Sequence, residues 1–191
     1  MVTDAPPKSR SPLEEFDHSD RLVDLAVPAD DRLLAAAEAI QAAMKTARRG
    51  QVEQTCAMFL QQAADFYRVS RPPVRVLAAR PLRTSDDGWG TELFGDYDFQ
   101  TKLIRVWMRT AVRKEITSFG TFLSTLCHEL CNHLDFELFH FQRTPHTRGF
   151  YERTAAVYHS ARGTPRKRLV WAPLRGGRWR IDWAKSNKLV Q

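Results

Sequence analysis

A histidine and a glutamate stand side by side at His128 and Glu129. In a His-Glu-x-x-His pattern the two histidines differ by only about 40° around a helix, so both can bind one Zn²⁺. The glutamate then acts as general base on the metal-bound water. In this chain the residue four after His128 is Asn132, so the pattern lacks one of its ligands.

Asn132 leaves three interpretations open: natural loss of a ligand, a weak oxygen ligand, or an introduced substitution. Two neighbours could replace the missing ligand. His133 lies about 140° around the helix from His128, so it would reach the ion only if the helix were distorted. Cys131 is within helical reach of the same side and thiolate binds Zn²⁺ well, but a small buried side chain is the more ordinary role.

A further histidine, His146, follows Asn132 after thirteen residues and begins a segment with a glycine and two aromatic residues, Gly149, Phe150 and Tyr151. A zinc site with two ligands on one helix needs a third from elsewhere, and a histidine just before a new helix can supply it. The region from 74 to 160 therefore resembles the SprT-like family of zinc metallopeptidases. The cysteine-rich zinc ribbon of that family is absent, because no cysteine follows Cys131.

The resemblance implies hydrolysis of peptide bonds in a protein or peptide substrate. It implies that His128, His146 and the position of Asn132 bind Zn²⁺ and that Glu129 is the general base. Beyond it, we expect Tyr151 or Arg153 to stabilise the oxyanion. Asp135 would either orient a ligand ring or form a salt bridge.

The resemblance also implies an α+β, zincin-like fold, in which N-terminal helices pack on a small mixed sheet. The metal-site helix lies beneath the sheet, and a further helix closes the cleft. Hydrophobic periodicity predicts helices over about 30–48, 52–67, 118–139 and 147–161, and strands near 74–77, 92–97 and 101–110.

Boundary signals accompany these elements. Ser118 and Gly163 are expected to begin the third helix and end the last. Gly50 is expected to separate the first two helices, and a turn is expected at 86–88. The strand at 101–110 would be either an edge strand that pairs with an extended substrate or an ordinary strand of the sheet.

Composition divides the chain into three parts. Residues 1–28 are rich in Pro, Ser and charge, which predicts a disordered tail. Residues 29–163 form the predicted SprT-like domain. Residues 164–191 are basic and contain Trp171, Trp179 and Trp183, which could stack on single-stranded DNA or form a solvated face.

The formal net charge of +7 favours acidic partners. An alternative function is therefore a non-catalytic protein with a zincin-like fold, which binds nucleic acid or an acidic protein. Three cysteines provide no disulfide framework, and no apolar run predicts a signal peptide or membrane span. We expect a cytoplasmic protein.

Overall fold

Secondary structure in the computed structural model, which describes residues 1–84 and 90–188, is mixed. Six α-helices and three small β-sheets occur in this part of the chain. This agrees with the predicted α+β class. None of the helices in the described ranges combines the length and the apolar character needed to cross a lipid bilayer.

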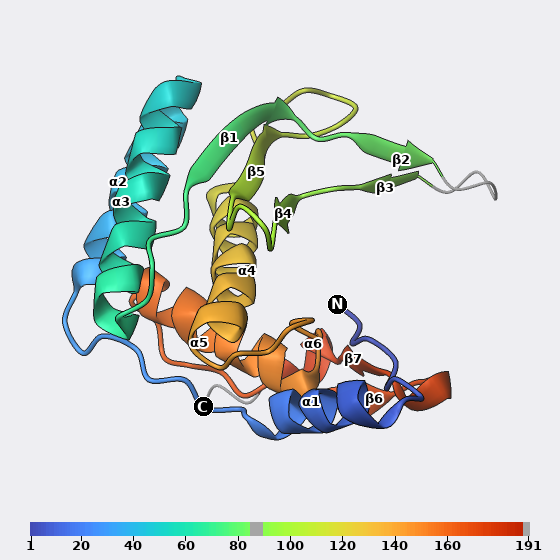
Figure 1. The fold of residues 1–191 in the computed structure, drawn as a ribbon. Helices are drawn as coiled ribbons and strands as arrows, with labels where there is room; N and C mark the ends of the chain where they lie inside the picture. Colours follow the sequence, from blue (N-terminus) through green and yellow to red (C-terminus); the bar gives the residue numbers. More distant parts are fainter. Residues whose placement is uncertain (85–89, 189–191) are drawn as a thin grey trace.

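The central sheet contains three strands in the order β1 (Val74–Ala79), β5 (Ile104–Arg109) and β4 (Gly95–Tyr97) (Figure 1). Strands β1 and β5 are parallel, whereas β4 and β5 are antiparallel. Alternate side chains of β5, including those of Ile104, Val106 and Met108, are buried in the core. Because β5 has a neighbour on each side, the prediction that it is an edge strand is wrong. The edge strands of this sheet are β1 and β4.

A second, two-stranded sheet joins β2 (Leu82–Thr84) and β3 (Gly90–Glu92). The single strand predicted over 92–97 is therefore divided between β3 and β4. The turn predicted at 86–88 lies outside the described residues.

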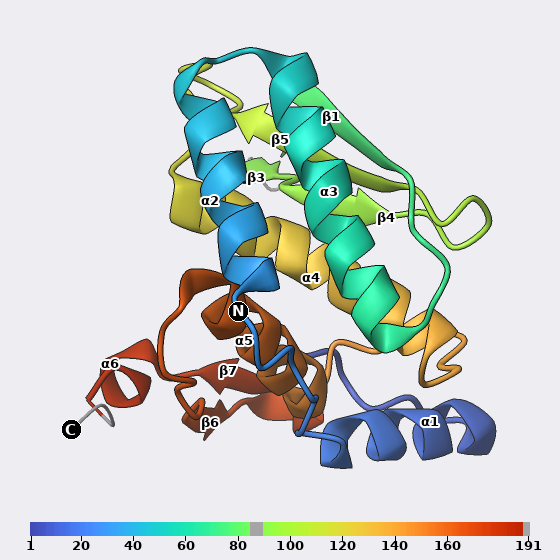
Figure 2. The ribbon, with the colours of Figure 1, turned by 90° about the vertical axis from the view of Figure 1, so that its left-hand side faces the viewer.

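Helix α3 (Arg49–Tyr67) packs on β1, and α2 (Arg32–Lys45) lies beside α3 (Figure 2) and also contacts α5. The connection between them is at 46–48, where Ala47 has a φ of 56°. Gly50 is inside α3 and does not separate the helices as predicted. It is tolerated because the first turn of a helix has few intrahelical hydrogen bonds to lose.

The remaining two long helices carry the residues singled out in the sequence. The Ser118 hydroxyl accepts a hydrogen bond from the Thr121 amide at 3.2 Å and begins α4 (Phe119–Glu137). In the same way Thr147 begins α5 (Arg148–Arg162), which ends at Gly163 with a φ of 60°. The prediction that Ser118 and Gly163 mark helix ends is confirmed.

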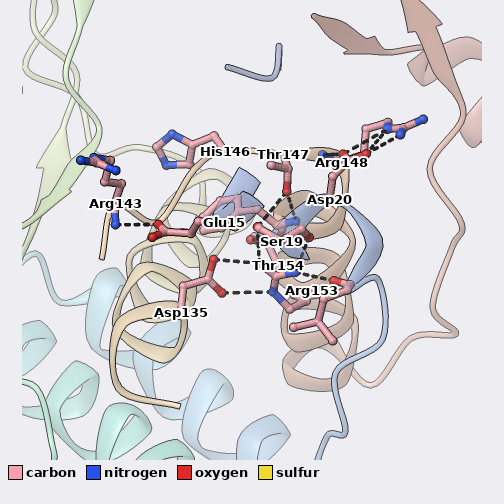
Figure 3. A network of polar contacts seen from close by, with 12 residues as sticks. Glu15, Ser19, Asp20, Asp135, Arg143, His146, Thr147, Arg148, Arg153 and Thr154 are labelled. Atoms are coloured by element: carbon pink, nitrogen blue, oxygen red, sulfur yellow. Dashed lines mark hydrogen bonds and ion pairs between the residues drawn. The ribbon is translucent and has the colours of Figure 1, made fainter. Parts of the chain in front are cut away.

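The N-terminal segment, predicted to be a disordered tail, contains helix α1 (Arg10–Arg21) packed on α5. The buried Arg153 guanidinium donates to the Ser19 carbonyl and hydroxyl, both at 3.1 Å, and Arg148 pairs with Asp20 (Figure 3). These partners lie more than a hundred positions apart in the chain. Local composition cannot reveal such long-range pairs, which explains why disorder was predicted instead.

The C-terminal segment forms a hairpin of β6 (Trp171–Pro173) and β7 (Trp179–Ile181), with the 3₁₀ turn η1 (Arg175–Gly177) between them. The short helix α6 (Trp183–Ser186) follows. Val2 forms an antiparallel bridge with Arg180 of β7. The N-terminal segment therefore packs on the C-terminal hairpin, below the central sheet in Figure 1.

Candidate metal centre

Two histidines from different elements lie next to each other. His128 comes from the middle of α4, and His146 stands two residues before the start of α5. Their ring centroids are 4.8 Å apart, and the Phe150 ring contacts both rings edge-on. Two imidazoles that share one tetrahedral Zn²⁺ have centroids about 5 Å apart. The two ring planes are nearly parallel, at 26°, so this spacing permits a shared ion once one ring turns about its side-chain bonds.

Glu129 and Asn132 lie on the same part of α4, and each is only 5% exposed. The Asn132 amide donates a hydrogen bond to the Glu129 carboxylate at 3.0 Å. The other end of the amide, Oδ1, is buried without a hydrogen-bond partner, and so is Nε2 of His146. Buried polar atoms without partners are rare and often mark the place of an ion or water.

Two imidazoles and an amide oxygen fit Zn²⁺ in chemical type, although the amide is a weak ligand. Within 1–84 and 90–188, no three His, Cys, Asp or Glu side chains are grouped as a complete metal site.

Two cavities meet at these residues. A cavity of about 340 Å³ is lined by Asp4, His128, Glu129, Asn132 and His146, among others. A larger one, of about 810 Å³, opens on the other side of His128 and Glu129. Its walls come from α4, α5, β4 and the C-terminal segment. The general-base candidate therefore borders a space large enough for a peptide segment.

Strand β4 lies unusually close to the site. A Cβ atom at Gly95 would be 2.6 Å from the Thr125 methyl group and 2.8 Å from a carboxylate oxygen of Glu129. Only glycine allows this approach of strand and helix. The edge of the sheet is thereby placed beside Glu129.

Burial shifts the pKa values of two site residues, the candidate general base Glu129 and the candidate metal ligand His128. Desolvation raises the pKa of Glu129 to about 8, against the opposing hydrogen bond from Asn132. Desolvation and the neighbouring His146 lower the pKa of His128 to about 3. The metal-free site therefore holds a neutral imidazole, which is the form that binds metal.

Replacing Glu129 by Gln should stabilise the metal-free protein at alkaline pH. Folded Glu129 keeps its proton to about pH 8, whereas the unfolded residue ionises near 4.5. The stabilising contribution of the protonated Glu129 side chain to the free energy of unfolding is therefore fully present below pH 4.5. It is lost as the pH rises from 4.5 through 8. Glutamine removes this loss, so the variant should gain roughly 4 kcal/mol in free energy of unfolding at pH 8 and nothing near pH 4.

Urea unfolding in the presence of a chelator would measure this difference. Glu38→Gln, an exposed site on α2, is the matched control and should show no such pH dependence. A constant difference between Glu129→Gln and the parent from pH 4 to pH 8 would contradict the raised pKa.

The two alternative ligands considered from the sequence, His133 and Cys131, do not face the candidate metal centre. Both ring nitrogens of His133 have other partners, Nδ1 with the Tyr97 hydroxyl at 3.0 Å and Nε2 with the Ser70 carbonyl at 2.7 Å. Cys131 is buried, and desolvation raises the pKa of its thiol to about 12. It therefore remains a protonated core residue. Neither side chain lines the two cavities.

Asp135 and Arg153 form an ion pair in which both side chains are 1% exposed. The carboxylate accepts two hydrogen bonds from the guanidinium, at 2.7 and 3.1 Å (Figure 3). The prediction that Arg153 stabilises an oxyanion is therefore wrong, and Asp135 takes the salt-bridge role. Tyr151 lines the large cavity, but its hydroxyl donates to the Val2 carbonyl at 3.1 Å.

The structure adds a site residue that the sequence did not suggest. Asp4 lines the smaller cavity, and its carboxylate accepts a hydrogen bond from the His146 amide at 2.8 Å. Hydrogen bonding to His146 lowers the pKa of Asp4. The two residues are 142 positions apart, and no local motif links them.

Comparisons with protein-family models, with curated proteins and with solved structures give no match for this chain.

Proposed function

We propose that this chain is a zinc-dependent peptidase of the SprT-like type, with a zincin-like fold. One observation supports this most directly. His128, Glu129, Asn132 and His146, which the sequence pattern singled out, lie together at the meeting point of two cavities. They come from α4 and from the segment before α5, as a shared ion would require.

Each residue then has a defined task. Zn²⁺ bound by His128, His146 and the weaker oxygen of Asn132 would supply Lewis acidity. With the cation bound beside it, Glu129 would be ionised, would accept a proton from the attacking water and would transfer it to the leaving amine. The Asn132 amide holds the Glu129 carboxylate in place through their hydrogen bond.

The surroundings of Glu129 suit an extended peptide. Strand β4 is the edge strand next to Glu129, so its backbone can pair with a substrate. The larger cavity carries apolar and aromatic side chains on several walls, among them Phe94, Tyr158, Leu169 and Trp183. Substrate side chains next to the scissile bond would pack there.

Peptide hydrolysis by the full chain should require added zinc and should stop when a chelator removes it. His146→Ala should lower the rate by about 100-fold or more, because only one imidazole then remains at the site. The measurement is cleavage of an unfolded polypeptide followed by mass spectrometry. His140→Ala, at an exposed position outside the site, is the control. Cleavage that persists in chelator would contradict the proposal.

The C-terminal segment supports a second candidate, binding of single-stranded nucleic acid. Among the described residues of this segment, seven basic residues are exposed: Arg166, Arg168, Arg175, Arg178, Arg180, Lys185 and Lys188. Trp183 is 48% exposed beside them. Trp171 and Trp179 are half-buried. The Trp171 ring contacts Tyr151, and the Arg148 guanidinium lies over the Trp179 ring.

Changing Arg175, Arg178 and Lys188 together to Gln should weaken binding of single-stranded DNA. If each contacts one phosphate, the slope of log affinity against log salt should fall by about 2. Point changes are preferable to deletion from residue 164, because β7 pairs with Val2. Fluorescence anisotropy at several salt concentrations would test this. Unchanged affinity and slope would exclude this surface as the binding site.

A further inference from the structure

Residues Val2, Thr3 and Asp4 are fixed in an extended segment beside the candidate metal centre. The Thr3 amide donates to the Trp179 carbonyl at 2.8 Å, and the Trp179 amide donates to the Thr3 hydroxyl at 2.8 Å. The Asp4 amide in turn donates to the His146 carbonyl at 3.0 Å. The backbone of Asp4 therefore has a defined position relative to His146.

The Asp4 carboxylate faces one particular nitrogen of the His146 ring. Its Oδ2 atom accepts a hydrogen bond from the His146 amide and lies 3.6 Å from Nδ1 of the same residue. The other ring nitrogen, Nε2, is buried and has no hydrogen-bond partner. An imidazole that directs Nδ1–H at a carboxylate keeps Nε2 unprotonated, which is the form that binds metal.

We propose that Asp4 is a positioning residue for His146, whose carboxylate selects the ring tautomer and orientation that leave Nε2 free to bind Zn²⁺. The inference rests on the proposed function, because it assumes that the site binds zinc. If the Asp4 carboxylate and Nδ1 of His146 both bound the ion directly, Nε2 of His146 would stay buried without a partner. The Asp4 side chain is also 55% exposed, which suits an outer position better than a place at the ion.

Asp4→Asn should therefore weaken zinc binding by about 10- to 100-fold, the usual effect of removing a carboxylate behind a histidine ligand. The zinc dissociation constant would be measured by competition with a chromophoric chelator. Both the full parent chain and its Asn132→His variant would be used. In the metal-free protein, ¹⁵N NMR of the His146 ring should show Nδ1–H in the parent and a mixture of tautomers in Asp4→Asn.

Two controls separate the carboxylate from other effects. Asp17→Asn makes the same change of charge at an exposed site on α1. Thr3→Val removes the bond to Trp179 and loosens the same segment without changing Asp4. An equal loss of affinity in either control would overturn the proposal. A loss above about 10³-fold in Asp4→Asn would also overturn it, because that size indicates a direct ligand.

The test also distinguishes this inference from the proposed function. If no variant binds zinc, including Asn132→His, the proposed function fails. The tautomer measurement still decides the role of Asp4, because it needs no metal. The same His146 tautomer in the parent and in Asp4→Asn would show that the carboxylate does not select it.

Discussion

Replacing Glu129 by Gln should abolish most peptide hydrolysis while leaving zinc bound. The side chains are nearly equal in size, and glutamine can still accept a hydrogen bond from a neighbouring donor. An amide cannot take the proton of the attacking water, however, and general-base catalysis contributes about 10²- to 10⁴-fold to such reactions. We expect the loss of turnover to be about 10³-fold.

The comparison is best made in the Asn132→His background, where zinc occupancy should be high in both proteins. Zinc content should be the same in Glu129→Gln as in the protein that keeps the Glu129 carboxylate, so that the difference in rate reflects the chemical step. Glu38→Gln again serves as control, because its side chain is exposed on α2. Equal turnover with and without the Glu129 carboxylate would exclude the general-base role.

Local sequence signals predicted the helices well because each signal acts within a few residues. The Ser118 and Thr147 hydroxyls bond amides three positions ahead, and Gly163 adopts a left-handed conformation that few other residues accept. The grouping of His128, Glu129 and Asn132 is local in the same sense. It follows from the pitch of one helix.

The features that were not predicted depend on distant partners. The residues of β5 predict an amphipathic strand. They do not indicate that β1 pairs with one side of it and β4 with the other. Helix α1 is held on α5 by two arginines. Arg153 donates a hydrogen bond to the Ser19 carbonyl, and Arg148 donates to the Asp20 carboxylate. Asp4 reaches His146 only because the N-terminal segment pairs with β7. Such contacts require the three-dimensional arrangement of the chain.

The identity of residue 132 should control metal affinity. Asn132→His places a second imidazole four residues after His128, on the wall of the cavity of about 340 Å³ that already includes His146. An amide oxygen is a poor ligand for Zn²⁺, whereas a neutral imidazole is a good one. We therefore expect the parent to bind zinc weakly and the variant to bind it about 10³-fold more tightly or better.

Isothermal calorimetry and thermal melts with zinc would measure this change. Zinc at about 100 times the dissociation constant stabilises the folded state by about 2.7 kcal/mol, so the melting temperature of the variant should rise at zinc concentrations that leave the parent unaffected. Gln41→His adds a histidine at an exposed position on α2, away from both cavities, and should bind no better than the parent. Equal affinities for Asn132→His and the parent would show that position 132 does not face the ion. A parent that already holds one tightly bound zinc per chain would instead mean that the oxygen of Asn132, or the Asp4 carboxylate acting as a direct ligand, completes the shell.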